Sequence, residues 1–397
     1  MNLKEMQSAL SLDSIPSAFE EIFSRIGQTW EARAAHILSE TCIRTTLTDC
    51  YAMLPYLDTV CDAAACIQKN PALCLLVCLL EQWIADGVSP AFPEYTPPSG
   101  EGLEYDFLHL FPAISTMPNS VKFFRDRQLP EDIIAASMRE YDDSVATSLL
   151  QQGRPVFDKG RLAWLVLATR NHIMRLGRLK FDMPDLYMEK VRVYENETGE
   201  QIILADGIQV HRSGRVLGSV GHTDTDGSFL AEITETEDTV TGYPAIREFV
   251  QNTPVTLSKS QWTLRLCAQD PVIRMHIPRD ESFDPEIVER SYAQAREIFA
   301  RHFPDYPYKA FFCNSWLMSQ ELPSILKPTS NILAFQNKFT IVPSISVGRA
   351  VFSFVFLREA QIPDSLDDLP QNTSLERSIV QVYRQGGYIH EGSGFFF

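Results

Sequence analysis

The sequence predicts an α/β protein of the α+β type, in which an N-terminal helical bundle precedes a mixed sheet flanked by helices. Three observations support this prediction. Apolar residues from 14 to 85 recur with a period near 3.6, as in helices. Short alternating runs separated by turn residues follow between 190 and 272. Residues 272–313 then have the order strand, loop, helix, strand with short connections, which is typical of a βαβ unit.

The first helices are predicted from the spacing of Ile15, Phe19, Ile22, Phe23 and Ile26, which places these side chains on one helix face. The bundle ends in a segment from 89 to 100 that contains several prolines and cannot continue a helix. We therefore expect a helical domain at 1–118 and a second domain at 119–397, with a strand-rich insertion at about 190–260.

Within the second domain, the strongest helix signal lies at 284–302. Asp284 is a natural N-cap and Pro285 suits the first helical position. The apolar end at 394–397 is expected to dock into the sheet. The other elements predicted here are helices at 161–176, 319–326 and 374–385 and strands at 272–278, 309–313 and 345–357.

Composition excludes several classes of protein. A chain of 397 residues is too long for one ordinary core, and a hydrophobic content of 45% is typical of a folded protein. The formal net charge of −16 disfavours nucleic acid and anionic membranes as partners. The N-terminus has no apolar signal core, and the longest apolar run, at 71–85, is short for a membrane span. We expect a cytoplasmic protein.

No metal cofactor is expected. Six of the eight cysteines lie between 42 and 78, but no CxxC pair occurs, and Cys74 and Cys78 only share a helix face. These thiols are interpreted as small core side chains. The turn at 222–227 has calcium-loop character, but no glutamate stands six residues after Gly227 to close the site.

The loop from Arg279 to Phe283 is the first candidate binding site. The following helix offers unpaired backbone N–H groups and the positive end of its dipole, which suits a pyrophosphate, and Arg279 adds a cation. In the alternative interpretation, Asp284 only caps its own helix, while Asp280 and Glu281 repel an anion.

The strand end at Cys313, Asn314 and Ser315 is the second candidate, because strand ends in α/β sheets commonly border a crevice. Asn314 and Ser315 can hydrogen-bond an amide-bearing cofactor arm. Cys313, paired with His276, would suit a covalent acyl intermediate. The alternative is a buried core cysteine.

His276 is the candidate general base, because histidine titrates near neutral pH and can deprotonate an amine. It lies in an apolar strand between Met275 and Ile277. The alternative role is that of a hydrogen-bonded structural histidine.

Four short segments resemble bacterial acyltransferase-domain proteins, which pair a helical N-terminal domain with a GNAT-like C-terminal domain. The similarity follows the element order over roughly 120 to 397. The segments are 175–181 (RLGRLKF), 276–278 (HIP), 313–317 (CNSWL) and 330–332 (SNI) followed by Phe335 and Gln336.

The resemblance implies that the His276 strand is the central GNAT strand and that the Cys313 strand splays away from it to admit a pantetheine arm. The intervening loop would receive the pyrophosphate of acetyl-CoA or another acyl-CoA. The residues of this loop are Ile277, Pro278, Arg279, Asp280, Glu281, Ser282 and Phe283, and Asn314 would contact the cofactor arm.

The activity implied is direct transfer of an acyl group from coenzyme A to a small-molecule or peptide amine, with deprotonation by His276 or a water chain. The loop contains none of the spaced glycines usual in the family. That departure favours the alternative of a non-catalytic ligand-binding or interaction module. The sequence does not specify the amine, the acyl chain or the oligomeric state.

Overall fold

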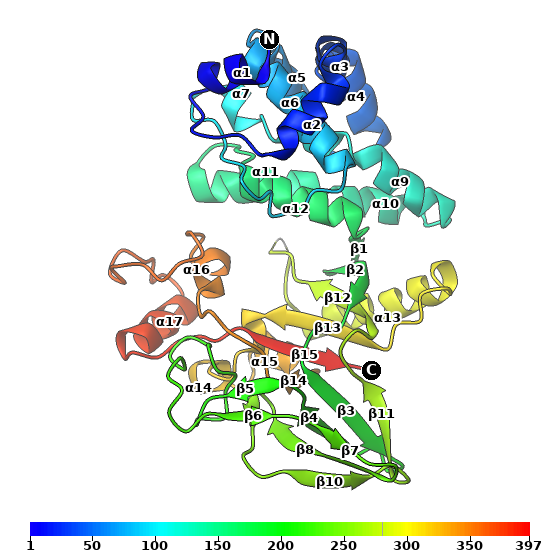
Figure 1. The fold of residues 1–397 in the computed structure, drawn as a ribbon, viewed down its shortest axis with the longest axis vertical. Helices are drawn as coiled ribbons and strands as arrows, with labels where there is room; N and C mark the ends of the chain where they lie inside the picture. The colour runs from blue at the N-terminus through cyan, green and yellow to red at the C-terminus, as the bar shows by residue number, and fades with distance from the viewer. Residues whose placement is uncertain (280) are drawn as a thin grey trace. The chain divides into compact units, whose positions relative to one another are not determined.

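A computed structural model describes residues 1–279 and 281–397, apart from the side chains of Pro184 and Asp185. The chain divides into two compact units, Met1–Leu176 and Gly177–Phe397 (Figure 1). The helical unit thus continues beyond the boundary expected at 118, because α12 (Lys159–Arg170) packs on α8 (Leu110–Ile114), α9 (Met117–Asp126) and α11 (Glu140–Gln152).

The first unit is built around α6 (Pro71–Ala85), which is buried on nearly every side and packs against five neighbouring helices. Asn70 caps it by accepting the backbone N–H groups of Ala72 and Leu73. The remaining elements of this unit are α1 (Leu3–Ala9), α2 (Ala18–Ile26), α3 (Trp30–Ile37), α4 (Glu40–Asp49), η1 (Leu54–Tyr56), α5 (Leu57–Ile67), α7 (Leu103–Asp106), α10 (Glu131–Met138) and β1 (Met174–Leu176).

The described part of the chain has no single helix that is both long and apolar enough to cross a membrane. One pair of helical segments, Leu54–Ile67 and Pro71–Ala85, meets the length and composition of a span together, but with a bend of 115° between them.

The second unit contains a mixed sheet with the order β2-β12-β13-β15-β14 (Figure 1). Strands β12 and β13 are parallel, and their neighbours run antiparallel. The C-terminal strand β15 inserts between β13 and β14, which confirms that the apolar end docks into the sheet. The bounds are β2 (Leu179–Leu186), β12 (Pro271–His276), β13 (Ala310–Ser315), β14 (Thr340–Val342) and β15 (Gly392–Phe396).

Helix α13 (Pro285–His302) makes the crossover from β12 to β13 and covers one face of the sheet. Asp284 caps it by accepting the N–H of Glu286 at 2.9 Å, as predicted. On this face, the ring of Tyr292 lies 5.0 Å from that of Phe396, which stacks on Phe311. The strand–helix–strand order and the predicted fold class are therefore confirmed.

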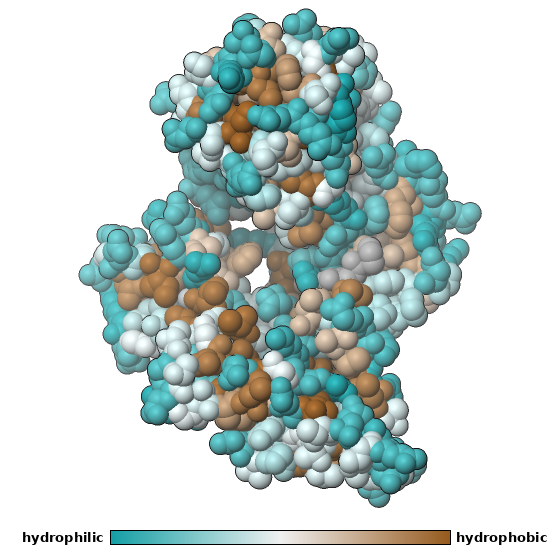
Figure 2. Space-filling model, in the orientation of Figure 1, coloured by the Kyte–Doolittle hydropathy of each residue, from teal (hydrophilic) through white to brown (hydrophobic). Residues whose placement is uncertain are grey.

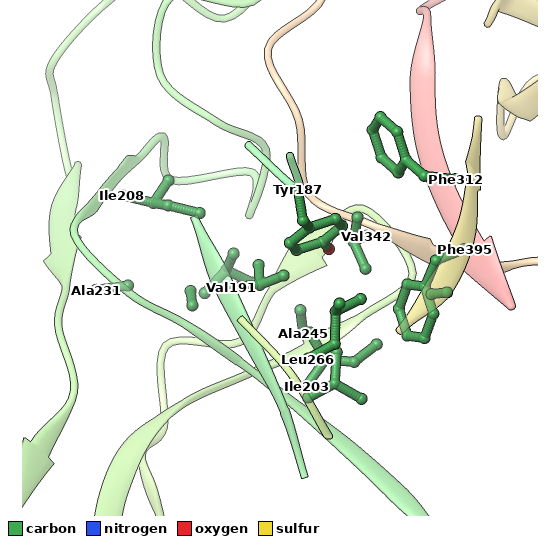
Figure 3. Close-up of a cluster of buried hydrophobic side chains, with 14 of the residues drawn as sticks. Tyr187, Val191, Ile203, Ile208, Ala231, Ala245, Leu266, Phe312, Val342 and Phe395 are labelled. Carbon is green, nitrogen blue, oxygen red and sulfur yellow. The ribbon is translucent and has the colours of Figure 1, made fainter. Parts of the chain in front are cut away.

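The opposite face packs against a second, antiparallel sheet with the order β10-β8-β4-β3-β11. Figure 3 shows the shared core, in which Tyr187 approaches Phe312 and Phe395. The strands are β3 (Val191–Asn196), β4 (Gln201–Ala205), β8 (Thr239–Ile246), β10 (Val255–Ser258) and β11 (Trp262–Leu266), with β7 (Thr234–Glu235) and β9 (Phe249–Val250) beside β8 and a separate β5 (Ile208–Val210)–β6 (Phe229–Ala231) pair.

The prediction of a strand at 345–357 is wrong. The segment forms a turn followed by α16 (Ala350–Phe354), because the Glu391 carboxylate accepts the backbone N–H groups of residues 347–350 and wraps the chain around itself. Ile345, Val347 and Phe354 are exposed. Figure 2 shows hydrophobic residues at the surface in this part of the second unit.

The other elements of the second unit are short. The helix predicted at 319–326 is only η2 (Trp316–Met318) and α14 (Leu322–Ile325), followed by α15 (Asn331–Gln336). The predicted C-terminal helix is α17 (Ser374–Arg384), with a capping box formed by Thr373 and Glu376.

Candidate active site at the diverging strands

The two parallel strands of the main sheet separate before either one ends. Residues Val272–Arg274 pair with Ala310–Phe312, and the pairing stops there. Strand β12 nevertheless continues on β2 to His276, and β13 continues on β15 to Ser315. The strands therefore diverge at their carboxyl ends.

Strand alternation places the candidate residues on different faces. Arg274 and Phe312 are paired and point to the face of the second sheet, so His276 and Asn314 point there too. Cys313 and Ser315 point to the α13 face. The structure therefore does not bring Cys313 and His276 together.

Cys313 has the properties of a core thiol. It has no exposed surface, and burial raises its pKa to about 12. A thiol in this state carries almost no thiolate at neutral pH.

His276 contacts a carboxylate on the neighbouring strand. Its Nε2 lies 3.1 Å from Oδ2 of Asp182, which is completely buried, while 22% of the His276 side chain is exposed. A carboxylate in this position orients an imidazole. Sequence reasoning missed Asp182, because the register between β2 and β12 brings it to His276.

Asn314 and Ser315 both make hydrogen bonds within the protein. The Asn314 amide donates to Oγ of Ser393 at 2.8 Å, and Ser393 donates to the carboxylate of Glu189. Burial raises the pKa of Glu189. Ser315 Oγ accepts the N–H of Leu317 and thereby caps η2.

The described residues of the loop after β12 make contacts near both of its ends. Arg279 is exposed and donates from Nη1 to the carbonyl of Phe354 at 2.9 Å. Near the other end of the loop, Ser282 accepts a hydrogen bond from Nε of Arg178. Ile277 and Pro278 are half-buried, Glu281 and Ser282 are exposed, and Asp280 lies outside the described residues.

Phe283 anchors the end of this loop beside the start of α13. Its ring lies 4.9 Å from that of Phe335, and the Arg178 guanidinium lies over it at 5.4 Å. The loop therefore enters the helix through a fixed aromatic contact, and the 18 residues of α13 provide a helix N-terminus at this point.

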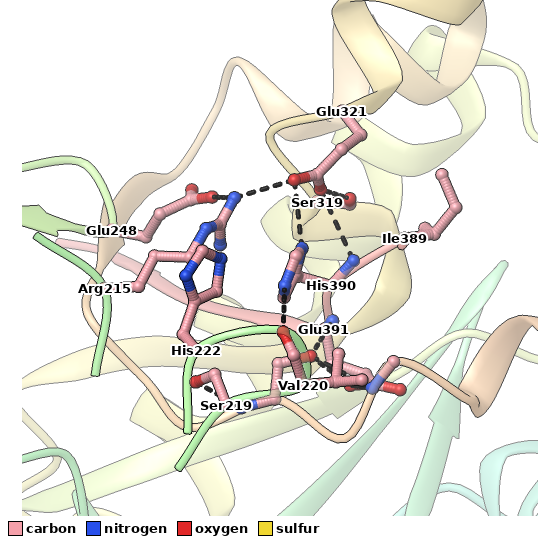
Figure 4. Close-up of polar contacts among 12 residues, drawn as sticks. Arg215, Ser219, Val220, His222, Glu248, Ser319, Glu321, Ile389, His390 and Glu391 are labelled. Carbon is pink, nitrogen blue, oxygen red and sulfur yellow. Dashed lines mark hydrogen bonds and ion pairs between the residues drawn. The ribbon is translucent and has the colours of Figure 1, made fainter. Parts of the chain in front are cut away.

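An ionic cluster lies at the same edge of the sheet, formed by Arg215, Glu248, Glu321 and His390 (Figure 4). Nη2 of Arg215 lies 2.8 Å from Glu248 and 2.7 Å from Glu321, and Glu321 also contacts Nδ1 of His390 at 3.0 Å. His390 directly precedes β15, whose first residue, Gly392, pairs with the end of β13. Sequence reasoning missed this cluster, because its members come from distant segments.

The pKa values of the two carboxylates in the ionic cluster are shifted in opposite directions. Burial raises the pKa of Glu248 to about 7. Burial would also raise the pKa of Glu321, but hydrogen bonds from His390 and Ser319 outweigh it and lower that pKa to about 2.

Comparison with known proteins decides the family. The model of the GNAT-like C-terminal domain matches residues 173–396, which is more than half of the chain. The chain belongs to this GNAT-like family. The resemblance noted from the four short segments is thereby confirmed, and the diverging strands belong to the GNAT-like domain.

Solved acyltransferases share this GNAT-like fold together with the helical first unit. One is an acyltransferase mutant in complex with octanoyl-CoA, at 18% identity and a TM-score of 0.62. Another is an acyltransferase in complex with decanoyl-CoA and teicoplanin, at 19% identity and a TM-score of 0.62. Each comparison covers 100% of this chain and 99% of the other. No curated protein matches the chain.

Proposed function

We propose that this GNAT-like protein transfers an acyl group from an acyl-CoA to an amine. The observation that carries the proposal is the divergence of β12 and β13 after Arg274 and Phe312. Backbone groups of both strands are then available to hydrogen-bond the amides of a pantetheine arm, as an added strand would. The octanoyl-CoA and decanoyl-CoA complexes of similarly folded proteins support a medium-length acyl chain.

The pyrophosphate is proposed to bind at the loop 277–283. The N-terminus of α13 supplies backbone N–H groups and a positive dipole end. Arg279, which is exposed and, among the described residues, donates to the backbone carbonyl of Phe354, can turn toward a phosphate. The loop does not need a glycine if the phosphates are held from this side.

His276 is proposed to accept a proton from the reacting amine, with Asp182 orienting the imidazole. The amine nitrogen attacks the thioester carbonyl and forms the C–N bond. The C–S bond then breaks, coenzyme A leaves as the thiolate, and the thiolate takes up a proton to become the thiol. Holding both reactants in one complex supplies much of the rate enhancement.

The acceptor is proposed to be an amine on a small molecule or peptide. Teicoplanin in complexes of similarly folded proteins makes an amine of a large glycopeptide one class to screen. The net charge of −16 favours acceptors that are cationic.

Isothermal titration with acetyl-CoA, octanoyl-CoA and decanoyl-CoA tests the proposal. We expect micromolar binding, weakened about tenfold by Arg279→Ala because one charge-assisted contact to phosphate is lost. Arg301→Ala is the matched control, since Arg301 is exposed in the last turn of the same helix. No binding at millimolar ligand would overturn the proposal and leave the non-catalytic module as the working model.

A further inference from the structure

A second set of hydrogen-bonded titratable side chains lies in the loop 211–224, apart from the His276 pair. We call Asp224, His211, Ser213 and His222 the histidine relay. Nε2 of His211 lies 3.1 Å from Oδ2 of Asp224, and its Nδ1 lies 2.8 Å from Oγ of Ser213. The same Oγ lies 3.2 Å from Nδ1 of His222. The relay therefore runs from an exposed carboxylate, through a buried imidazole, to a partly exposed one.

The hydrogen bonds assign the protons of the relay. An ionised carboxylate only accepts, so His211 carries its hydrogen on Nε2 and its Nδ1 is an acceptor. That nitrogen also accepts the backbone N–H of Ser213 at 3.1 Å. The Ser213 hydroxyl gives its one hydrogen to the nearer ring, that of His211, and so accepts from Nδ1–H of His222. The lone pair of His222 is then on Nε2, and within the described part of the chain this nitrogen has no hydrogen-bond partner.

The surroundings keep His222 neutral. Burial, followed by the charge of Arg215, lowers its pKa, while Glu321 acts in the opposite direction. Both ring nitrogens of His390 face acceptor oxygens, those of Glu321 and of the Val220 carbonyl. The ring centroid of His390 lies 5.7 Å from that of His222.

The loop is fastened to the edge of the sheet where β12 and β13 diverge. His390 Nε2 donates to the carbonyl of Val220, and the Val220 N–H donates to the carbonyl of Ser346 at 2.9 Å. Ser219 accepts the N–H of Ser346 at 3.2 Å. Figure 4 shows the turn from Ser219 to His222 beside His390, two residues before the start of β15.

An ammonium acceptor must lose two protons before it becomes an amide nitrogen. The first leaves before attack, because only the free amine has a lone pair, and the second leaves the nitrogen after the C–N bond forms. His276 accounts for one of these transfers. One of the two protons ends on the coenzyme A thiolate and the other has to leave the site, so a proton acceptor connected to water suits this edge of the sheet.

We propose that Nε2 of His222 takes the first proton from the ammonium group of the acceptor. This inference rests on the proposed function and adds that the substrate is an alkyl ammonium. One N–H bond of the acceptor breaks and one forms on Nε2. The Nδ1 hydrogen then passes to Ser213, the hydroxyl hydrogen to His211, and the Nε2 hydrogen of His211 to Asp224. Asp224, with about half of its side chain exposed, releases the proton to water.

Nitrogen-detected NMR of the full chain, labelled with ¹⁵N-histidine, tests the assignment without any acceptor. His222→Gln identifies the resonance. The expected result is a neutral ring at pH 7 with its hydrogen on Nδ1, and Ser213→Ala should shift the ring toward the other tautomer. A hydrogen on Nε2, or a charged ring at pH 7, would overturn the proposal.

Kinetics with octanoyl-CoA form the second arm, using benzylamine, an ammonium ion at pH 7, and aniline, which is neutral. His222→Gln should slow transfer to benzylamine at least tenfold more than transfer to aniline, while octanoyl-CoA affinity stays unchanged. His36→Gln, on an exposed residue of α3, is the control. Equal losses for both amines would overturn the proposal. Failure of the unaltered protein to bind acyl-CoA would overturn the proposed function as well, so the two failures are distinguishable.

Discussion

The imidazole of His276 meets the fully buried carboxylate of Asp182 across the antiparallel pair β2–β12, with Nε2 and Oδ2 3.1 Å apart. An amide in place of that carboxylate keeps the shape but removes the charge that stabilises an imidazolium. We expect Asp182→Asn to lower kcat by roughly 10- to 100-fold, within the range that general base catalysis contributes. Acyl-CoA affinity, measured by titration, should not change.

Asp238→Asn is a suitable control for that substitution, because Asp238 is exposed and, within the described part of the chain, its carboxylate makes no hydrogen bond. An unchanged kcat in Asp182→Asn protein that remains folded would assign the His276–Asp182 pair to structure rather than to catalysis.

Cys313 should be unreactive in the native protein. Its sulfur is buried, and its pKa of about 12 leaves it protonated. We expect iodoacetamide to modify partly exposed cysteines such as Cys42 and to leave Cys313 unlabelled, as read by peptide mass spectrometry. Cys313→Ala should retain acyl transfer and lose about 1 kcal/mol of stability. Loss of turnover without loss of folding would restore the covalent intermediate as a hypothesis.

Glu391 should be a major contributor to the stability of the second unit. It accepts hydrogen bonds from four consecutive backbone N–H groups and from Ser346. Glu391→Gln leaves one uncharged acceptor oxygen and places an NH2 donor against backbone N–H groups, so we expect a loss of about 2–3 kcal/mol in urea denaturation. Because the turn leads to Phe354, whose carbonyl binds Arg279, acyl-CoA affinity should also weaken.

Glu376→Gln provides the comparison for Glu391, since it alters a half-buried capping-box carboxylate of α17. It should cost under about 1 kcal/mol. Equal effects of the two substitutions would contradict the role given to the turn.

Glu248 should make the protein less stable as the pH rises from about 4.5 to 7. Its folded pKa of about 7 lies above the ordinary 4.5, so the folded state binds the extra proton in that interval. The stability it contributes is complete below pH 4.5 and is lost as the pH passes 7. Glu248→Gln should therefore reduce the change in the urea midpoint between pH 5 and pH 8.

Glu321 should behave in the opposite way, which makes it the internal control. Its folded pKa of about 2 lies below the ordinary value, so its contribution is present above about pH 4.5 and is lost as the pH falls toward 2. Glu321→Gln should lower stability at pH 7 more than at pH 3. The same pH dependence of stability in both variants would contradict the opposite pKa shifts assigned to Glu248 and Glu321.

Local signals were sufficient for the part of the fold that forms the candidate site. Asp284 and Pro285 mark the start of α13 within one residue, because capping depends on neighbours in sequence. The alternating apolar pattern at 345–357 led to a wrong strand prediction. The carboxylate that binds this segment and turns it belongs to Glu391, far along the chain. No local pattern records such a contact.

The chemistry of the site depends even more on distant pairings. His276 was predicted as a candidate base because it is a histidine within an apolar strand. Its partner Asp182 could not be predicted, because the register of β2 on β12 brings the two residues together. His222 was assigned to a turn, and only the fold brings His211, Ser213 and His390 to it. Side-chain networks between segments require the tertiary structure.

The place of β15 between β13 and β14 has a consequence for biosynthesis. Strand β13 gains its second neighbour only when residues 392–396 have been made, long after Ser315. At ordinary translation rates this leaves the edge of β13 open for on the order of ten seconds on the ribosome. An open, apolar strand edge invites pairing with other chains, so the nascent protein is expected to need a chaperone during that interval.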